Sequence, residues 1–177
     1  MKALSALLVV LAATVTVTAC SGPGPAVHGN SQTTPLALAH TVGCDQIIQQ
    51  HGPPGGRLVL GVLAVPPAHL KPAASTDTSP WAYFAKYGIA IRADSPVVVI
   101  TVPAAWRHRA AIGWGNNVGD SSLRLLSCPR QMGAWNAYAG GFYLRSASGC
   151  VPLVVEIGRQ TVSLSFAIGS GSCGSAT

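Results

Sequence analysis

The most regular pattern of hydrophobic and polar positions lies between residues 151 and 168. On each side of a short break every second residue is large and apolar: Val151, Leu153, Val155 and Ile157 before the break, and Val162, Leu164, Phe166 and Ile168 after it. Alternation with a period of two is typical of strands that bury one face. The pattern therefore predicts two β-strands in this part of the chain.

Gly158-Arg159 separates these strands and predicts a hairpin. Glycine accepts a positive φ without a steric clash, so it suits the first central position of a type II′ turn. The register of this turn brings apolar residues opposite each other: Val155 with Val162, Leu153 with Leu164, and Val151 with Phe166. The other face is polar, and we expect it to contact water through Glu156, Thr161, Ser163 and Ser165.

Shorter apolar segments between turn-forming residues predict the other strands: residues 58–65, buried on both faces, and then 97–102, 110–114, 122–128 and 135–145. Residues 81–93 also alternate like a strand. Ser79-Pro80 fits the start of a short helix as well, but we favour the strand. Residues 43–51 fit one short helix that buries Ile47-Ile48.

The segment 135–145 carries further expectations. Phe142 and Leu144 would point inward, and Tyr143 and Arg145 outward, while Gly140-Gly141 predicts a bulge or a close approach of backbones. Altogether about seven to nine strands are expected, with little helix. This is typical of an all-β sandwich of the Ig-like or jelly-roll type, with a closed barrel as the alternative.

The first twenty residues have the features of a leader. Lys2 precedes a short apolar run that ends in Val17-Thr18-Ala19-Cys20. This motif resembles the lipobox of bacterial lipoprotein precursors, and the Ala/Gly/Pro-rich composition is similar to that of lipid-anchored domains of high-GC Gram-positive bacteria. The resemblance implies cleavage before Cys20 and lipid attachment to its thiol. An ordinary signal peptide cut near Ala19 is the alternative.

The leader sets the expected organisation of the chain. Residues 1–19 would be a lipoprotein signal peptide, residues 20–40 the lipidated cysteine with a flexible tether rich in Gly, Pro, Ser and Thr, and residues 41–177 one β-sandwich domain. The expected location is the extracytoplasmic face of the cell membrane. Two or three acyl chains would anchor the protein stably.

The cysteine count fits an exported chain. With Cys20 lipidated, Cys44, Cys128, Cys150 and Cys173 remain, which is enough for two disulfides. The hairpin brings Cys150 close to Cys173, so we favour Cys150–Cys173 and, by elimination, Cys44–Cys128. There is no C-x-x-C or H-E-x-x-H motif and no phosphate-binding loop, so we expect neither a metal nor a cofactor.

The charge balance bears on partners. Removing Lys2 with the leader lowers the formal charge from +6 to about +5. A basic, charge-poor surface outside the membrane favours anionic neighbours such as phospholipid headgroups or acidic wall polymers, although it can also serve solubility alone. Nucleic acid is a poor candidate partner for an exported domain with so few basic residues.

Candidate catalytic residues are few. The mature chain has only five acidic residues, and it has no G-x-S-x-G motif. Gly119-Asp120-Ser121-Ser122-Leu123 resembles the GDS(L) hydrolase block, but the block lies late in the chain and no histidine follows His108. We therefore interpret the block as a loop that enters a strand. An extracytoplasmic hydrolase with an unrecognised site, which uses Asp120, Ser121 or Glu156, is the alternative function.

The remaining candidate is a group of aromatic, basic and amide residues that could form a ligand platform: Trp106, Arg107, Arg109, Trp114, Asn116, Trp135 and Tyr138. Indole and phenol faces stack on sugar rings, and Arg and Asn bond acidic groups or hydroxyls. We weigh this against the interpretation that Trp114 and Trp135 are core residues, which we favour. The predicted function is a non-catalytic, lipid-anchored module that binds an envelope polysaccharide, another envelope component or a protein partner. A purely structural role in complex assembly is a further possibility.

Overall fold

The computed structural model describes residues 39–49, 56–76, 78–130 and 133–174, all within one compact unit, Pro35–Thr177. The predicted leader, Cys20 and nearly all of the predicted tether lie outside the described residues. Strand β1 begins at His40, where the predicted tether ends. In the described part of the chain, no helix has the length and apolar composition needed to cross a membrane.

The described residues form β-strands and two short 3₁₀ helices. In chain order these are β1 (His40–Val42), η2 (Cys44–Gln46), β2 (Arg57–Val59), β3 (Leu63–Val65), β4 (His69–Leu70), β5 (Ala73–Ala74), β6 (Tyr83–Lys86), β7 (Ile89–Arg92), β8 (Val98–Thr101), η3 (Ala104–Trp106), β9 (Ala110–Trp114), β10 (Ser122–Leu125), β11 (Trp135–Tyr138), β12 (Gly140–Leu144), β13 (Gly149–Ile157) and β14 (Gln160–Ile168). The all-β, sandwich-like fold is confirmed.

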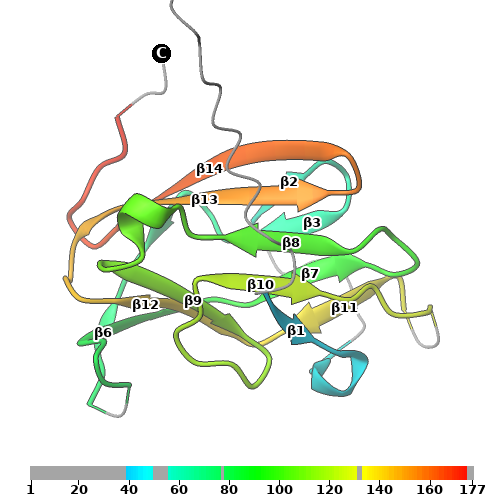
Figure 1. The fold of residues 1–177 in the computed structure, drawn as a ribbon, viewed down its shortest axis with the longest axis horizontal. Coiled ribbons are helices and arrows are strands. Elements are labelled where there is room, and N and C mark those ends of the chain that lie inside the picture. The colour runs from blue at the N-terminus through cyan, green and yellow to red at the C-terminus, as the bar shows by residue number, and fades with distance from the viewer. Residues whose placement is uncertain (1–38, 50–55, 77, 131–132, 175–177) are drawn as a thin grey trace, which may run out of the picture. The chain divides into compact units, whose positions relative to one another are not determined.

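The largest sheet has six strands in the order β1-β10-β8-β13-β14-β4. Its longest strands form the hairpin β13–β14 (Figure 1, orange), which lies between β8 and the edge strand β4. The predicted register is confirmed: Val155 pairs with Val162, Leu153 with Leu164 and Val151 with Phe166. Gly158 has a φ of 61°, as the predicted turn requires. The polar face is exposed at Thr161, Ser163 and Ser165, whereas Glu156 is half-buried.

The two smaller sheets, β11-β7-β3-β2 and β5-β6-β12-β9, share one antiparallel ladder. Trp135 pairs with Arg92 in the first sheet and Leu144 with Tyr83 in the second, and both pairs have the same register. Between them the N–H of Tyr87 donates to the carbonyl of Gly140 at 2.8 Å. The segments 83–92 and 135–144 therefore form one long pair of strands with a local interruption.

The interruption has a physical cause at the carbonyl of Tyr87. The carbonyl of Tyr87 accepts a bond from Nε1 of Trp114 at 2.9 Å, and the carbonyl of Ala139 accepts from the N–H of Gly115 at 2.9 Å. The Tyr87 carbonyl is thus bonded to the Trp114 ring instead of the ladder, whereas the bond from Gly115 to Ala139 continues the β9–β12 ladder by one step. Both contacts join the C-terminal end of β9 to the middle of the long strand pair.

The main core lies between the six-stranded sheet and this second layer. Its cluster of buried side chains takes residues from all three sheets, among them Ile100, Leu153 and Phe166 from the first layer and Ile91 and Phe142 from the second. Phe142 contacts Phe166 across the layers with ring centroids 5.1 Å apart. The predicted inward positions of Phe142 and Leu144 are therefore confirmed.

Gly140 and Gly141 lie where backbones approach closely, as predicted. A Cβ on Gly140 would collide with the carbonyl oxygen of Gly113, and a Cβ on Gly141 with the carbonyl oxygen of Ala85. The glycines let β12 pack between β9 and β6. Tyr143 belongs to the other face of β12 but is only 7% exposed, contrary to the expectation for an outward residue, because its ring packs on Phe84 at 4.7 Å.

Two expectations for the first half of the chain are wrong. Residues 58–65 do not form one buried strand but the hairpin β2–β3, with Leu60 at a φ of 49° and Gly61 at 69° in the turn. Leu58 is 55% exposed as a result. In residues 43–51 the helix is limited to η2, and Gln49 instead bridges to Ala137 of β11. His51 and its neighbours lie outside the described residues.

The strand count also exceeds the expected seven to nine, because the described residues form fourteen strands. The additional strands are short. For example, β4 and β5 have two residues each. Such short strands carry too few alternating positions to show a period.

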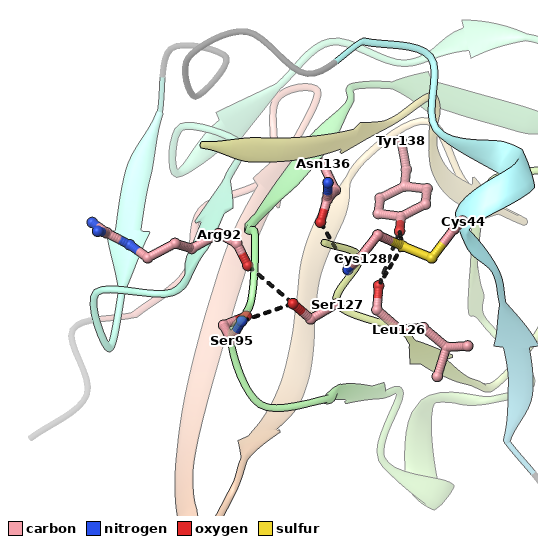
Figure 2. The surroundings of a disulfide bond; sticks show 8 residues. All are labelled: Cys44, Arg92, Ser95, Leu126, Ser127, Cys128, Asn136 and Tyr138. Carbon is pink, nitrogen blue, oxygen red and sulfur yellow. Dashed lines mark hydrogen bonds between the residues drawn. A yellow bond between two sulfur atoms is a disulfide. The ribbon is translucent and has the colours of Figure 1, made fainter. Parts of the chain in front are cut away.

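Both disulfides of the favoured pairing are present, Cys44–Cys128 and Cys150–Cys173. Cys44–Cys128 joins η2 to the segment that follows β10 (Figure 2). Around it, the side-chain oxygen of Asn136 accepts the N–H of Cys128 at 3.0 Å. The hydroxyl of Ser127 accepts the N–H of Ser95 at 2.8 Å and donates to the carbonyl of Arg92 at 3.3 Å.

Candidate functional site

The residues of the predicted aromatic platform do not come together on one surface. Trp114 and Tyr138 are 1% and 0% exposed and belong to the main core. Trp135 is 8% exposed and belongs to a separate small cluster with Ala64, Ala90 and Ala137. The favoured interpretation, that Trp114 and Trp135 are structural, agrees with these positions.

The buried platform residues have their polar atoms satisfied inside the protein. Nε1 of Trp114 donates to Tyr87, as described above, and its ring packs edge-on against Phe142 with centroids 5.7 Å apart. The hydroxyl of Tyr138 donates to the carbonyl of Leu126 at 3.0 Å. Burial, and secondarily the negative charge of Asp45, raises the pKa of Tyr138 to about 12. Tyr138 therefore stays neutral at physiological pH.

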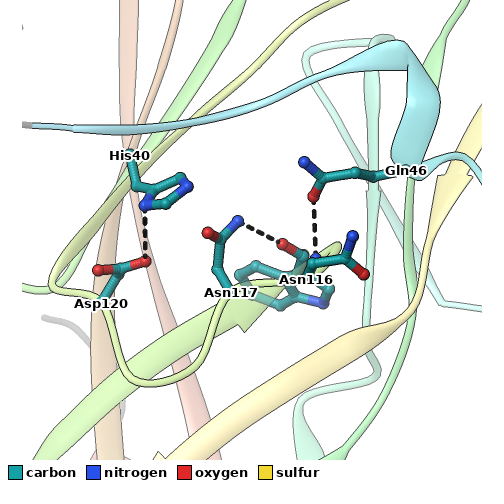
Figure 3. A network of polar contacts seen from close by, with 6 residues as sticks. His40, Gln46, Asn116, Asn117 and Asp120 are labelled. Atoms are coloured by element: carbon teal, nitrogen blue, oxygen red, sulfur yellow. Dashed lines mark hydrogen bonds and ion pairs between the residues drawn. The ribbon is translucent and has the colours of Figure 1, made fainter.

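The loop that carries Asn116 is fixed by the beginning of the domain (Figure 3). The side-chain oxygen of Gln46 accepts the N–H of Asn116 at 2.9 Å, and the amide of Asn117 donates to the carbonyl of Trp114 at 3.0 Å. At the other end of the loop, Nδ1 of His40 lies 3.7 Å from Oδ2 of Asp120. These contacts hold Asn116 in a turn that follows the C-terminal end of β9, whereas Trp106 precedes its N-terminal end.

The candidate residues of a hydrolase occupy separate places. Asp120 faces His40, and burial raises the pKa of Asp120 while the proximity of His40 lowers it to a smaller extent. Within the described part of the chain, no serine hydroxyl bonds to a histidine. Glu156 lines a cavity of about 200 Å³ with Arg124, on the outer side of the six-stranded sheet. The contacts of Asp120, Ser121 and Glu156 thus give no paired nucleophile and base.

Three platform residues remain near the surface around η3, namely Trp106, Arg107 and Arg109. The guanidinium of Arg107 donates through Nε to the carbonyl of Val102 at 3.2 Å, so it supports the backbone before η3. Trp106 and Arg109 instead line a cleft of about 340 Å³. The sequence-predicted platform is thus reduced to these two residues.

The cleft lies between η3, the ends of β9 and β12, and the open end of the β13–β14 hairpin. Its lining combines two guanidinium groups, one indole, two hydroxyls and an apolar floor: Trp106, Arg109, Ala110, Leu144, Arg145, Ser146, Ser148, Gly149, Val151 and Ile168. Among the described residues, no carboxylate lines it. The volume falls at the lower end of the range of about 300–1,000 Å³ that is typical of small-molecule sites.

The two arginines of the cleft are cross-strand neighbours. The β9–β12 ladder pairs Ala110 with Leu144, and the next pair outward is Arg109 with Arg145. The N–H of Arg145 donates to the carbonyl of Arg109 at 3.1 Å, which continues the ladder by one step. Like charges directly opposite each other on a sheet are destabilising. The pair therefore concentrates positive charge at the mouth of the cleft at some cost in stability.

Each of these guanidinium groups lies over an indole ring. Cζ of Arg109 is 5.3 Å from the ring centroid of Trp106, and Cζ of Arg145 is 5.5 Å from that of Trp81. Stacking of this kind restricts a flexible side chain and leaves the in-plane N–H donors available. Nε of Arg109 also donates to Nε2 of His108 at 3.1 Å. Each arginine of the cleft is thus held by an indole ring, and Arg109 is held by His108 as well.

The wall that carries Ser146 and Ser148 is tied to the end of the chain. A Cβ on Gly169 would collide with the carbonyl oxygen of Ala147, and one on Gly171 with the carbonyl oxygen of Gly149. The Cys150–Cys173 disulfide fastens these two segments. The disulfide that the hairpin predicted therefore also positions one side of the cleft.

Sequence reasoning found Trp106 and Arg109 but missed Arg145, Ser146 and Ser148. The missing signal is the pairing of β9 with β12, which brings Arg145 opposite Arg109. Among the described residues, no group of three His, Cys, Asp or Glu side chains could hold a metal ion.

Comparisons with protein-family models, with curated proteins and with solved structures find no match to this chain. Function is therefore inferred from the cleft itself.

Proposed function

We propose that this chain is a non-catalytic module that is held at the extracytoplasmic face of the cell membrane by a lipid on Cys20 and that binds a cell-envelope component. The observation that supports binding is the cleft beside η3, with Trp106, Arg109 and Arg145 around an apolar floor. Concave sites of this composition, with a few oriented polar groups, are the usual form of a small-ligand site.

The charge of the cleft supports an acidic component. Arg109 and Arg145 have no acidic partner among the described residues, where the one ion pair is His40–Asp120. The envelope outside a bacterial membrane offers phosphorylated lipids and acidic polymers, which match a basic cleft. The proposal favours binding over hydrolysis because the described lining supplies cations and hydroxyls but no carboxylate that could act as a base.

A fluorescence titration tests the proposed binding. A soluble form of the mature chain, with Cys20 replaced by Ser, would be titrated with fractionated envelope polymers and lipids at low and high salt. Trp106 lines the cleft, so ligand binding is expected to change the indole emission saturably. Replacement of Trp106 by Leu should remove most of this change, whereas replacement of the buried Trp135 by Phe should leave it in place. Absence of any saturable change would contradict the proposal.

The anchor has its own test. Mass spectrometry of the wild-type protein isolated from bacterial membranes should find a mature chain that begins at Cys20 with the added mass of its acyl groups. The Cys20→Ser variant should lose this mass and leave the membrane fraction. A mature chain that begins at another residue, without lipid, would support the alternative of an ordinary signal peptide.

A further inference from the structure

We propose that the ligand of the cleft is a phosphorylated amphiphile, with its phosphate between Arg109 and Arg145 and its apolar part on the cleft floor. This inference rests on the proposed function and specifies its ligand. It is carried by the paired arginines, by the indole rings beneath them, and by the contrast in the lining between exposed polar residues and buried apolar residues.

The paired arginines favour an anionic ligand. Arg109 and Arg145 are cross-strand neighbours, a position where like charges repel, and the described residues supply no carboxylate to either. An anion bound between them would convert this repulsion into two attractive contacts. Binding energy would thus come both from new bonds and from relief of the repulsion.

The geometry of the donors favours phosphate over carboxylate. A guanidinium presents parallel N–H groups that match two oxygens of one anion. Two such groups, together with the hydroxyls of Ser146 and Ser148, need more acceptor positions than a carboxylate provides, because a carboxylate has only two oxygens. A phosphomonoester has three strong acceptor oxygens and up to two negative charges, so it can serve both arginines at once.

The base of the cleft accounts for the apolar part of the ligand. It is formed by Ala110, Leu144, Val151 and Ile168, which continue into the main core and offer no polar side-chain group. An inorganic phosphate would leave this surface in contact with water. A short hydrocarbon attached to the phosphate would cover it, and the volume of about 340 Å³ limits that part to a small group or the first segment of a longer chain.

Calorimetric titration with synthetic phosphates tests this ligand class. The probes are inorganic phosphate, then butyl, hexyl and octyl phosphate, and octyl glucoside as an uncharged amphiphile with the same tail. We expect weak binding of inorganic phosphate and an affinity that rises about fourfold with each methylene added until the floor is covered. Octyl glucoside is expected to bind at least about tenfold more weakly than octyl phosphate, because it lacks the charge-assisted bonds.

Variants of the two arginines test whether the phosphate group binds between Arg109 and Arg145. Arg109→Gln and Arg145→Gln should each weaken octyl phosphate binding by about tenfold or more, while Arg145→Lys should retain part of the affinity because it keeps the charge but loses the paired donors. Arg159→Gln is the matched control. Arg159 is exposed at the turn of the β13–β14 hairpin, at the opposite end from the cleft, so the same loss of charge there should leave the affinity unchanged.

The outcomes separate this inference from the proposed function. Equal losses in Arg109→Gln and Arg159→Gln, or an affinity independent of tail length, would overturn the inference by showing general attraction to a basic surface. Tight binding of octyl glucoside that does not depend on the arginines would overturn it as well, yet the cleft would still be a ligand site. Failure of every probe here, with a saturable response to envelope polymers, would reject only the phosphorylated amphiphile. Failure of both titrations would reject the proposed function too.

Discussion

Arg109 and Arg145 lie directly opposite each other at the end of the β9–β12 ladder, joined by a backbone hydrogen bond of 3.1 Å from the N–H of Arg145 to the carbonyl of Arg109. Two positive side chains at such a position act against the stability of the fold, and the indole rings of Trp106 and Trp81 offset part of this cost. The pair is thus a place where stability and ligand binding have opposite requirements.

The repulsion can be measured by a double-mutant cycle. Each single change, Arg109→Gln or Arg145→Gln, removes the repulsion, so the second change adds no further relief. We expect a repulsive coupling of about 0.5 kcal/mol at low salt in urea unfolding, which falls as salt screens the charges. A coupling of zero at low salt, or one that grows with salt, would show that the two guanidinium groups do not interact.

Burial of Tyr138 predicts a loss of stability in alkaline solution. Folding raises its pKa from the ordinary 10.0 to about 12, chiefly through burial. A group whose pKa is raised on folding contributes stability that is complete below its unfolded pKa and is lost as the pH rises through its folded pKa. We therefore expect the free energy of unfolding to fall between about pH 10 and pH 12, by an amount on the order of 2–3 kcal/mol.

The variant Tyr138→Phe tests whether Tyr138 causes this loss of stability in alkaline solution. The variant should be less stable at pH 7 by about 1 kcal/mol, because the bond to the carbonyl of Leu126 is gone. Its stability should then decline less steeply above pH 10, so that the difference from wild type shrinks or reverses. Tyr83→Phe, in the half-buried strand β6, is the control and should keep the steep decline. An unchanged alkaline slope in Tyr138→Phe would assign the loss to another group.

The hairpin β13–β14 could be predicted down to its register, and the reason is local. Val151 to Ile157 and Val162 to Ile168 each alternate without interruption, and Gly158 at the turn between them fixes the pairing of both strands. The same reasoning failed at residues 58–65, where every residue but one is apolar and no period is visible. Gly61 is the one residue of this segment that indicates a turn.

The site could be predicted only in part, because it depends on contacts between distant segments. Trp106 and Trp114 are equivalent in the sequence, since both follow an apolar run and precede polar residues. The structure separates them: Trp114 reaches the carbonyl of Tyr87 inside the core, whereas Trp106 lies at the cleft. Arg145 joined the site through the β9–β12 register, which has no signature in either strand alone.

The close packing around Gly140 of β12 gives a third prediction. Gly140 has a φ of 155°, and a Cβ there would collide with the carbonyl oxygen of Gly113 and with Trp114. Gly140→Ala is expected to destabilise the fold by more than about 3 kcal/mol, because β9 cannot move without leaving the core. Gly61→Ala is the matched control. Its φ is also positive, at 69°, but nothing lies within 4 Å of the added Cβ, so the cost should be about 1 kcal/mol. Similar losses in both variants would show that the close approach at Gly140 is unimportant.

We expect Cys44–Cys128 to contribute more to stability and Cys150–Cys173 to contribute more to ligand binding. Cys44–Cys128 closes a sequence separation of 84 residues and Cys150–Cys173 one of 23. From loop-closure entropy alone, replacing the first pair by alanines should cost about 4.5 kcal/mol and replacing the second about 3.5 kcal/mol. Binding should show the reverse order, because only Cys150–Cys173 holds the segment with Ser146 and Ser148 against the end of the chain. Urea unfolding and octyl phosphate titration of the two double variants, under conditions where both remain folded, would measure the two effects separately. A larger loss of affinity in the Cys44/Cys128 variant would contradict the placement of the ligand beside the second disulfide.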